Sequence, residues 1–301
     1  MYKINIMINT LQNLSTSVSL ELKPSNKIRK KLRFLCIYNE TQALIKRLYI
    51  QIKRRPSTLI SGIIQPLLWL ILFGALFQNA PVGLLTSNIK YGTFLSPGII
   101  TFTAFTGSIN AGLPLMFDRE FGFLNRLLIS PLISRDSLLI SSVFFITAVT
   151  IIQTLTIIIF SFILFRSTLS ISTILTILFI TFLITLSTAS LSICLAFILP
   201  GHIEFLAFIL IINLPMLFSS TALAPLSFMP YWLQIIASLN PLTYAIESIR
   251  HLSITDYLYS NPIIVQTIWL DLQLFDSIYI LIIINIISLI LIKNIISYKF
   301  E

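Results

Sequence analysis

Two glycines stand at the spacing used by loops that bind phosphate. Gly107 and Gly112 are separated by four residues, as in the Gly-x-x-x-x-Gly-Lys-Ser/Thr motif, whose backbone wraps the phosphates while its lysine neutralises them. Leu113 and Pro114 occupy the positions where that motif needs lysine and a hydroxyl residue. We therefore expect no ATP site in this chain and no nucleotide affinity of its own.

The residues that most often carry catalysis or bind metals are few and scattered. The chain has two cysteines, Cys36 and Cys194, and two histidines, His202 and His251. Their positions allow neither a disulfide framework nor a histidine pair for haem or zinc. No Ser-His-Asp, Cys-His or paired-carboxylate arrangement is recognisable either. We expect no catalytic residues, no metal, no cofactor and no enzyme activity in the chain alone.

Long uncharged stretches follow the first 56 residues and predict an all-α integral membrane protein. Hydrophobic residues make up 56% and charged residues 10% of the chain, whereas about a quarter of a soluble protein is charged. Five windows without Asp, Glu, Lys or Arg can each supply the ~20 residues that cross a bilayer. A sixth, shorter window reaches that length if Lys293 snorkels to the interface. The predicted transmembrane helices are 57–79, 92–116, 138–164, 171–195, 204–224 and 277–297.

The distribution of basic residues predicts the orientation of these spans. Of 20 Lys and Arg residues, 12 precede position 56. Six crossings place 17 of the 20 on the side of the N-terminus and 3 on the other, as the positive-inside rule requires. Both termini should therefore lie on the inner side. The net charge of +9 then suits anionic lipid headgroups rather than nucleic acid.

The N-terminal region divides into two predicted segments. Residues 1–35 lack a continuous apolar core and a small-residue cleavage site, so we expect no signal peptide. Glu21 and the basic run 27–33 favour a disordered inner tail at 1–36 over an organelle transit peptide. Residues 37–55 form an amphipathic interfacial helix, because Leu44, Leu48 and Ile52 recur every four residues beside a basic face. A helix that merely anchors the topology is the alternative.

An inner segment and an outer segment are longer than simple connections need to be. Inside, a helix is predicted at 117–130, with an apolar ridge at Phe117, Phe121, Leu124 and Leu128 and a polar face that includes Asp118, Arg119, Glu120 and Arg126. This helix is either a docking element or a solvated loop helix. Outside, re-entrant helices are predicted at 228–262, or else an ordinary interfacial loop. Asn240 and Pro241 form a helix start there, and Glu247 and Arg250 can pair at i, i+3.

Four polar residues are predicted inside spans: Asn110, Gln153, Asn213 and Asn285. Their expected use is hydrogen bonding between helices, worth about 0.6 kcal/mol each. A place on a substrate path is the alternative reading for each of them.

These motifs resemble those of the type-2 ATP-binding-cassette exporter permeases. The likeness extends from about residue 37 to the end of the sixth span. It rests on Leu95-Ser-Pro-Gly-Ile-Ile100, on 118–128 with Pro131, on Phe228-Met-Pro-Tyr-Trp-Leu-Gln234, and on 240–250.

The resemblance implies a homodimer of six-span subunits, each docked on a separate ATPase subunit. It places the coupling motif at Asp118, Arg119, Glu120, Phe121, Leu124, Arg126 and Leu128, and the outer motif at Asn240, Pro241, Tyr244, Glu247 and Arg250. The implied function is outward transport of a hydrophobic or amphipathic substrate, such as a drug-like molecule, lipid or glycolipid. Phe123-Leu-Asn departs from the family's usual turn, which affects the choice of ATPase. A membrane scaffold and a stand-alone secondary transporter are the rival functions.

Composition also bears on the compartment. The core is rich in isoleucine and phenylalanine and sparing in alanine and glycine, which suggests an AT-rich gene. We therefore expect the plastid-encoded member of this family found in algae, in a chloroplast membrane, with a bacterial inner membrane as the alternative.

Overall fold

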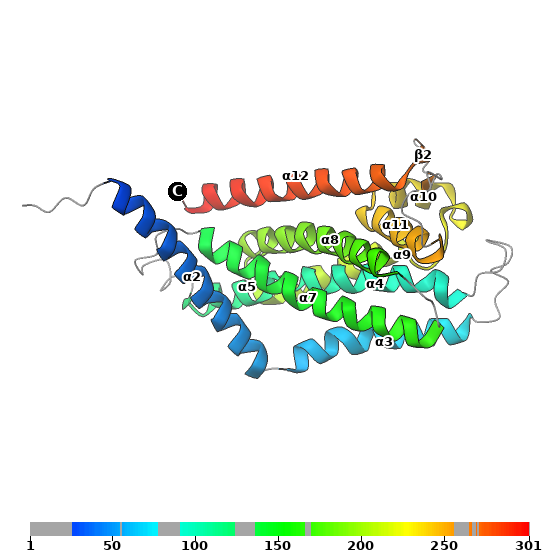
Figure 1. Ribbon diagram of the computed structural model, residues 1–301, viewed down its shortest axis with the longest axis horizontal. Coiled ribbons are helices and arrows are strands. Elements are labelled where there is room, and N and C mark those ends of the chain that lie inside the picture. Colours follow the sequence, from blue (N-terminus) through cyan, green and yellow to red (C-terminus); the bar gives the residue numbers. More distant parts are fainter. Residues whose placement is uncertain are drawn as a thin grey trace, which may run out of the picture.

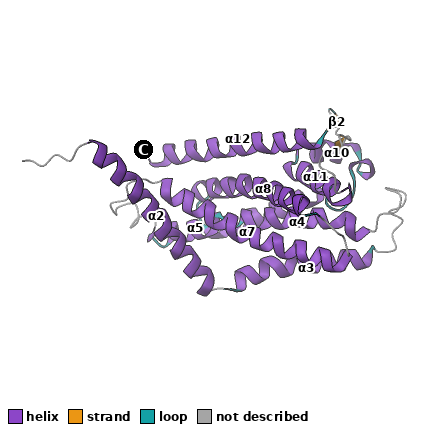
Figure 2. Cartoon of the chain, viewed as in Figure 1, coloured by secondary structure: helices purple, strands orange, loops and turns teal. Residues whose placement is uncertain are grey.

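The computed structural model describes residues 26–54, 56–77, 91–123, 136–165, 170–255, 265–266, 269 and 271–300. Nearly all of them are helical (Figure 2). In chain order the elements are α2 (Asn26–Arg54), α3 (Ser57–Leu76), α4 (Tyr91–Ile109), α5 (Gly112–Glu120), α7 (Asp136–Phe165), α8 (Ile171–Ile198), α9 (His202–Phe218), the 3-10 helix η2 (Leu226–Phe228), α10 (Tyr231–Leu239), α11 (Pro241–Thr255), β1 (Val265–Gln266), β2 (Asp271–Leu272) and α12 (Leu274–Phe300).

Long apolar helices run side by side between two ends of the molecule (Figure 1). Five segments of the described chain are long and apolar enough to cross a membrane: Leu59–Leu76, Tyr91–Glu120, Ser137–Phe165, Ile171–Ile198 and Leu274–Asn294. Helix α9 is also apolar but has 17 residues. Many large apolar side chains on α3, α7, α9 and α12 are exposed, as expected for surfaces that face lipid or another membrane helix. The prediction of an all-α integral membrane protein is confirmed.

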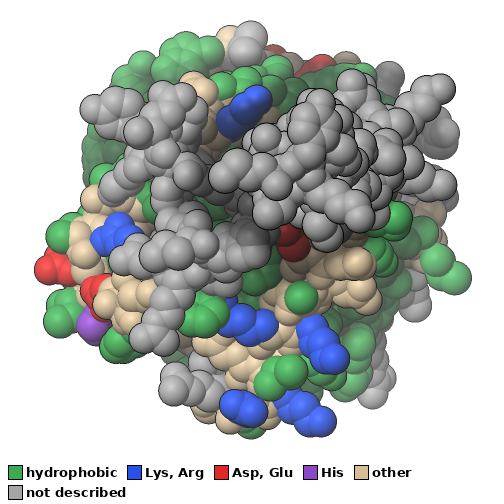
Figure 3. Space-filling view, turned by 90° about the vertical axis from the view of Figure 1, so that its left-hand side faces the viewer, with side chains coloured by type: hydrophobic (Ala, Val, Ile, Leu, Met, Phe, Trp, Pro, Cys, Tyr) green, Lys and Arg blue, Asp and Glu red, His purple; other side chains and the backbone are tan. Residues whose placement is uncertain are grey.

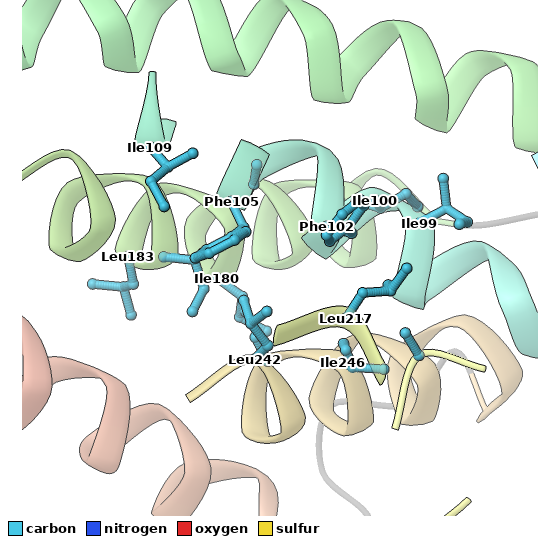
Figure 4. Close-up of a cluster of buried hydrophobic side chains, with 14 of the residues drawn as sticks. Ile99, Ile100, Phe102, Phe105, Ile109, Ile180, Leu183, Leu217, Leu242 and Ile246 are labelled. Atoms are coloured by element: carbon cyan, nitrogen blue, oxygen red, sulfur yellow. The ribbon is translucent and has the colours of Figure 1, made fainter. Parts of the chain in front are cut away.

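Helix α4 lies at the centre of the bundle and is buried along most of its length. It packs against α3, α7, α8 and α11. Figure 4 shows Phe102 and Phe105 of α4 with Ile180 of α8 and Leu242 of α11 in the buried cluster. Close packing of this kind, rather than hydrophobic transfer, holds helices together inside a membrane.

Helix α4 does not continue through residue 116, as the predicted span 92–116 required. It ends at Ile109, and α5 begins at Gly112. At this break, the Ser192 hydroxyl of α8 donates to the Ile109 carbonyl and accepts from the Gly112 amide, the latter at 2.8 Å. One side chain from a neighbouring helix thus satisfies backbone groups that the break leaves without helical partners.

The predicted helix 117–130 is also interrupted. Helix α5 ends at Glu120, and Gly122 has φ +71°. The Gly122 amide donates to the Arg119 carbonyl at 3.3 Å. A left-handed glycine just after a helix is a common terminator, because glycine lacks the Cβ that disfavours this conformation. Residues 124–130 lie outside the described part of the chain.

Further boundaries differ from those predicted, most clearly at the start of α2 and the end of α9. Helix α2 begins at Asn26, so the predicted disordered tail 1–36 is wrong for its last part, and residues 1–25 lie outside the described chain. Helix α9 ends at Phe218, whereas the predicted span extended to 224. Its end is marked by Ser219 and Ser220, whose amides donate to the carbonyls of Pro215 at 2.8 Å and Leu217 at 3.2 Å.

The predicted apolar stripe of the interfacial helix faces the protein. Leu44 and Leu48 are buried, and α2 packs against α7. Lys46, Lys53 and Arg54 are exposed, and the last two lie in the final turn of α2, where cations complement the helix dipole. Figure 1 shows α2 and the C-terminus at the same end of the molecule.

Candidate functional site: the inner coupling surface

Arg119 joins α5 to the C-terminal end of α8. Its guanidinium donates to the carbonyls of Ala196 at 2.9 Å, Phe197 at 3.2 Å and Pro200 at 2.6 Å, and to that of Leu199. The last carbonyls of a helix have no partner within the helix, and they carry its partial negative charge. A guanidinium, with five donors in a planar fork, suits this cluster of acceptors.

Glu120 joins α5 to the first residue of α9. Its carboxylate accepts from the backbone amide of His202 at 2.7 Å and also contacts Nδ1 of the same residue. The His202 ring in turn lies 5.2 Å from the ring of Phe117. A carboxylate at a helix N-terminus accepts from an unpaired amide and complements the positive end of the dipole. Arg119 and Glu120 therefore hold the two sides of the turn between α8 and α9.

Asp118 joins α5 to α2. Its Oδ1 lies 2.5 Å from Nη2 of Arg47, and the Arg47 guanidinium lies 4.1 Å from the centre of the Phe123 ring. The ion pair is half-buried, so it is shielded from salt better than a surface pair. Three consecutive charged residues of α5 thus contact three different helices.

Phe121 follows these residues and is 76% exposed. Its ring stacks on Phe117 with centroids 6.0 Å apart. A single exposed apolar side chain is common on protein surfaces, but Phe121 directly follows three residues that connect α5 to three other helices. Charged side chains of both signs lie on the same end of the molecule (Figure 3). We call Phe121, together with α5, the coupling surface.

The sequence predicted that the charged coupling residues form an open polar face of one helix, and the structure differs from this prediction. Asp118, Arg119 and Glu120 are occupied by contacts within the chain. Leu124, Arg126 and Leu128 lie outside the described residues. Sequence reasoning did not identify Arg47, Ser192 or His202 as partners of this region, because they are remote in sequence.

The outer motif forms a second cluster, at the start of α11. The Asn240 side chain accepts from the Leu242 amide at 3.0 Å, and Pro241 is the first residue of the helix. Both features match the predicted helix start. The Asn240 amide group also donates to the Met216 carbonyl at 3.0 Å, which ties α11 to the end of α9.

The predicted ion pair between Glu247 and Arg250 is present. The Arg250 guanidinium also donates to the carbonyls of Thr221 at 2.6 Å and Phe94 at 3.3 Å, and lies 3.8 Å from the Phe94 ring centre. Tyr244 donates to the Ser238 carbonyl at 2.5 Å. The outer motif therefore fixes α11 against α4 and the turn after α9.

The polar residues predicted inside spans have different environments. Asn285 of α12 donates to the Leu183 carbonyl of α8 at 2.7 Å, which confirms hydrogen bonding between helices at this position. Asn110 is exposed and donates to the Thr106 carbonyl within its own segment. Oε1 of Gln153 and Oδ1 of Asn213 are buried without hydrogen-bond partners among the described residues. For these two oxygens, the expected helix-to-helix hydrogen bond is absent from the described chain.

A bundle of long apolar helices, with the short helix α5 tied to three of its neighbours, defines a multi-pass membrane protein. Residues 39–254 match the family model described as ABC-2 type transporter, and the chain belongs to this family. The resemblance predicted from the motifs is confirmed.

The relatives support the same class over nearly the whole chain. A protein of Porphyra purpurea named "Putative transport permease ycf38" is 53% identical over 285 residues, which cover 94% of this chain and 98% of the relative. Proteins of the same name from Pyropia yezoensis and Cyanophora paradoxa are each 51% identical, over 281 and 262 residues, covering 93% and 87% of this chain and 97% and 90% of those relatives. These relatives are algal, and they fit the predicted location of this multi-pass protein in a chloroplast membrane.

Proposed function

We propose that this chain is the membrane-spanning subunit of an ATP-driven exporter. Two copies form the transport path, and each docks through its coupling surface on a separate ATPase subunit. The substrate is a hydrophobic or amphipathic molecule, and the chain itself hydrolyses no ATP. Membership of the ABC-2 type transporter family supports this proposal, because members generally dimerise and work with an ATPase.

The observation that carries the proposal is the set of contacts made by α5. Asp118, Arg119 and Glu120 connect α5 to α2, to the end of α8 and to the start of α9, while Phe121 projects outward. A movement imposed at Phe121 would therefore be passed to several helices together, as in a rigid-body switch. A loop helix without a partner would need no such connections.

The exposed face of α9 supports the second copy. The large apolar residues Ile203, Leu206, Leu210, Ile211, Leu214 and Phe218 are exposed along this helix, whereas Phe205, Ile209 and Leu217 are buried. Such a face must be covered either by lipid or by another helix. In a dimer, α9 of one copy would contact its partner and border the path.

Replacement of Phe121 tests the docking role. Phe121→Ala should insert and dimerise normally but weaken association with the co-purified ATPase about tenfold, the factor given by roughly 1.4 kcal/mol. A buried aromatic anchor can be worth this amount or more. The measurement is titration of the ATPase onto the permease in nanodiscs, together with the stimulated rate of ATP hydrolysis.

Phe275→Ala is the matched control. Phe275 is also an exposed phenylalanine, 50% exposed, at the start of α12, the end away from α2 (Figure 1). It should leave ATPase association unchanged. Normal recruitment and stimulation by Phe121→Ala would show that this surface does not dock the ATPase, and would favour a non-transporting scaffold.

A further inference from the structure

The break between α4 and α5 lies next to a proline. Pro114 is the third residue of α5, in the first helical turn, where its missing amide costs no hydrogen bond. In a helix continued from α4, the same residue would lie in the interior. Its ring would then clash with the Asn110 carbonyl, which would also lose its usual donor. Pro114 therefore disfavours an unbroken helix, but a break is stable only if the freed backbone groups find other partners.

The hydrogen bonds at the break are shifted by one residue from those of a continuous helix. The Ala111 amide donates to the Ser108 carbonyl at 3.0 Å, and the Leu113 amide donates to the Asn110 carbonyl at 3.1 Å. Both bonds join residues three apart, as in a 3-10 helix, rather than four apart as in an α-helix. In a continuous helix, each of these amides would donate to the preceding carbonyl instead.

Ser192 of α8 replaces the partners that the shift removes. Its hydroxyl accepts from the Gly112 amide at 2.8 Å and donates to the Ile109 carbonyl. In a continuous helix these two groups would bond to the Ser108 carbonyl and the Leu113 amide. The amides of the break thus have an acceptor in either arrangement, and the fully buried Ser192 side chain stabilises the broken one.

Gly112 allows this contact with α8. A Cβ at this position would lie 2.5 Å from the Ser192 carbonyl oxygen and 2.8 Å from Cζ of Phe205. The first of these atoms belongs to the backbone, so it can move aside only if α8 itself shifts. The missing side chain therefore lets α5 begin close enough to α8 for the Gly112 amide to reach the Ser192 hydroxyl.

A change between the two arrangements rotates α5. Each residue turns the chain by about 120° in a 3-10 helix and by about 100° in an α-helix. Moving the bonds of Ala111 and Leu113 from three-residue to four-residue spacing therefore turns α5 about its own axis relative to α4. Phe121, which follows the end of α5 and is 76% exposed, then points in another direction.

We propose that residues 109–113 form a switch with two hydrogen-bonding arrangements. Ser192 and Pro114 hold it in the broken arrangement, and the alternative is a proline-kinked helix that is continuous from α4 to α5. The switch sets the direction in which Phe121 projects. Its role in transport rests on the proposed function, because the direction of Phe121 then decides how the coupling surface meets the ATPase.

Distances within single copies test the switch. The full chain is used in nanodiscs without any ATPase, so a failure here is distinct from a failure of docking. With Cys36 and Cys194 replaced, spin labels at Phe121 and at Ile152, an exposed residue of α7, report their separation by double electron-electron resonance. Labelled copies are diluted with unlabelled ones, which excludes distances between two copies.

Removal of either restraint should populate a second distance. Ser192→Ala deletes the hydroxyl that bonds the backbone at the break, and Pro114→Ala removes the clash with the Asn110 carbonyl. Each should raise the ratio of the second distance to the first at least about tenfold. In the double variant the second distance should be the major one. Pro114→Ala keeps the described hydrogen bonds of the break, so it remains informative if Ser192→Ala lowers the stability of the fold.

Ser190→Ala is the matched control. Ser190 is also a fully buried serine of α8, but its hydroxyl donates to the Leu186 carbonyl of the same helix at 2.8 Å. Its replacement should leave the distances unchanged, and combined with Pro114→Ala it should add nothing. A single unchanged distance in Pro114→Ala and in the double variant, or an effect of Ser190→Ala equal to that of Ser192→Ala, would overturn the proposal.

Discussion

Arg250 is a charged residue with only 5% of its surface exposed. It pairs with Glu247, and its guanidinium donates to the carbonyls of Phe94 and Thr221. Arg250→Met should lower the free energy of unfolding by about 3 kcal/mol, the lower end of the range for a broken buried pair, because it leaves the mostly buried Glu247 carboxylate without its partner. Thermal unfolding in detergent micelles measures this change.

The double variant Glu247→Gln/Arg250→Met provides the control. It removes the unpaired charge, so it should recover part of the stability lost in Arg250→Met. Arg250→Lys should fall between wild type and Arg250→Met, because an ammonium keeps the charge but lacks the planar fork that reaches three partners. Equal stability of wild type and Arg250→Met would contradict the role assigned to this side chain.

For single residues, the sequence predicted contacts between neighbours in the chain but not contacts between distant residues. The i, i+3 spacing of Glu247 and Arg250 was sufficient, because one helical turn brings such residues together. The partners of Asp118, Arg119 and Glu120 are 71 to 82 residues away, and no local pattern shows which helices will meet. The cavity of about 390 Å³ lined by Gly62, Gly107 and Gln153 was missed for the same reason. Gly62 and Gly107 belong to two different helices, and neither is near Gln153 in sequence.

Among the helices, α5 is the one whose contacts would most directly transmit a movement to its neighbours. Arg119→Met keeps an apolar stem of similar length but removes the donors to the last carbonyls of α8. We expect amide hydrogen exchange to rise at least about tenfold in residues 196–204, because the turn between α8 and α9 then opens more often. Stability should fall by about 1–2 kcal/mol, less than for a fully buried contact.

Arg54→Met is the comparison for this experiment. Arg54 is exposed in the last turn of α2, and its replacement should leave exchange in residues 196–204 unchanged. If Arg119→Met also leaves exchange there unchanged, Arg119 does not hold the turn, and the connection between α5 and α8 carries no mechanical role.

Element types were easier to predict than element ends. The long apolar runs identified the helices because backbone groups in lipid must be satisfied within a helix. The break at 110–111 was missed because it depends on Ser192, which lies on another helix. Gly122 is a local signal for the end of α5. It was overlooked because the apolar residues of 117–128 recur with the 3.6-residue period of a helix. That period continues across the glycine, so the hydrophobic pattern alone favoured one helix.

For the whole molecule, the number of crossings depends on α9. Its 17 residues extend about 25 Å at 1.5 Å per residue, slightly less than the ~30 Å of bilayer hydrocarbon. A short span can be accommodated by local thinning of the bilayer at modest cost. We propose that α9 crosses, which gives six spans. The positions of α2 and the C-terminus at one end of the molecule (Figure 1) and the excess of basic residues on the predicted inner side support this count.

Single-cysteine labelling tests the topology. With Cys36 and Cys194 replaced, cysteines introduced at Ser15 and Lys299 should be protected from an impermeant maleimide in sealed, right-side-out membranes, and a cysteine at Ser260 should react. With five crossings, the C-terminus would change sides, because α12 would begin on the opposite face. Reaction of the Lys299 position with protection of Ser15 would therefore mean that α9 lies within one leaflet. Its exposed apolar face would then contact lipid rather than a second copy, and the dimer proposed here would need a different interface.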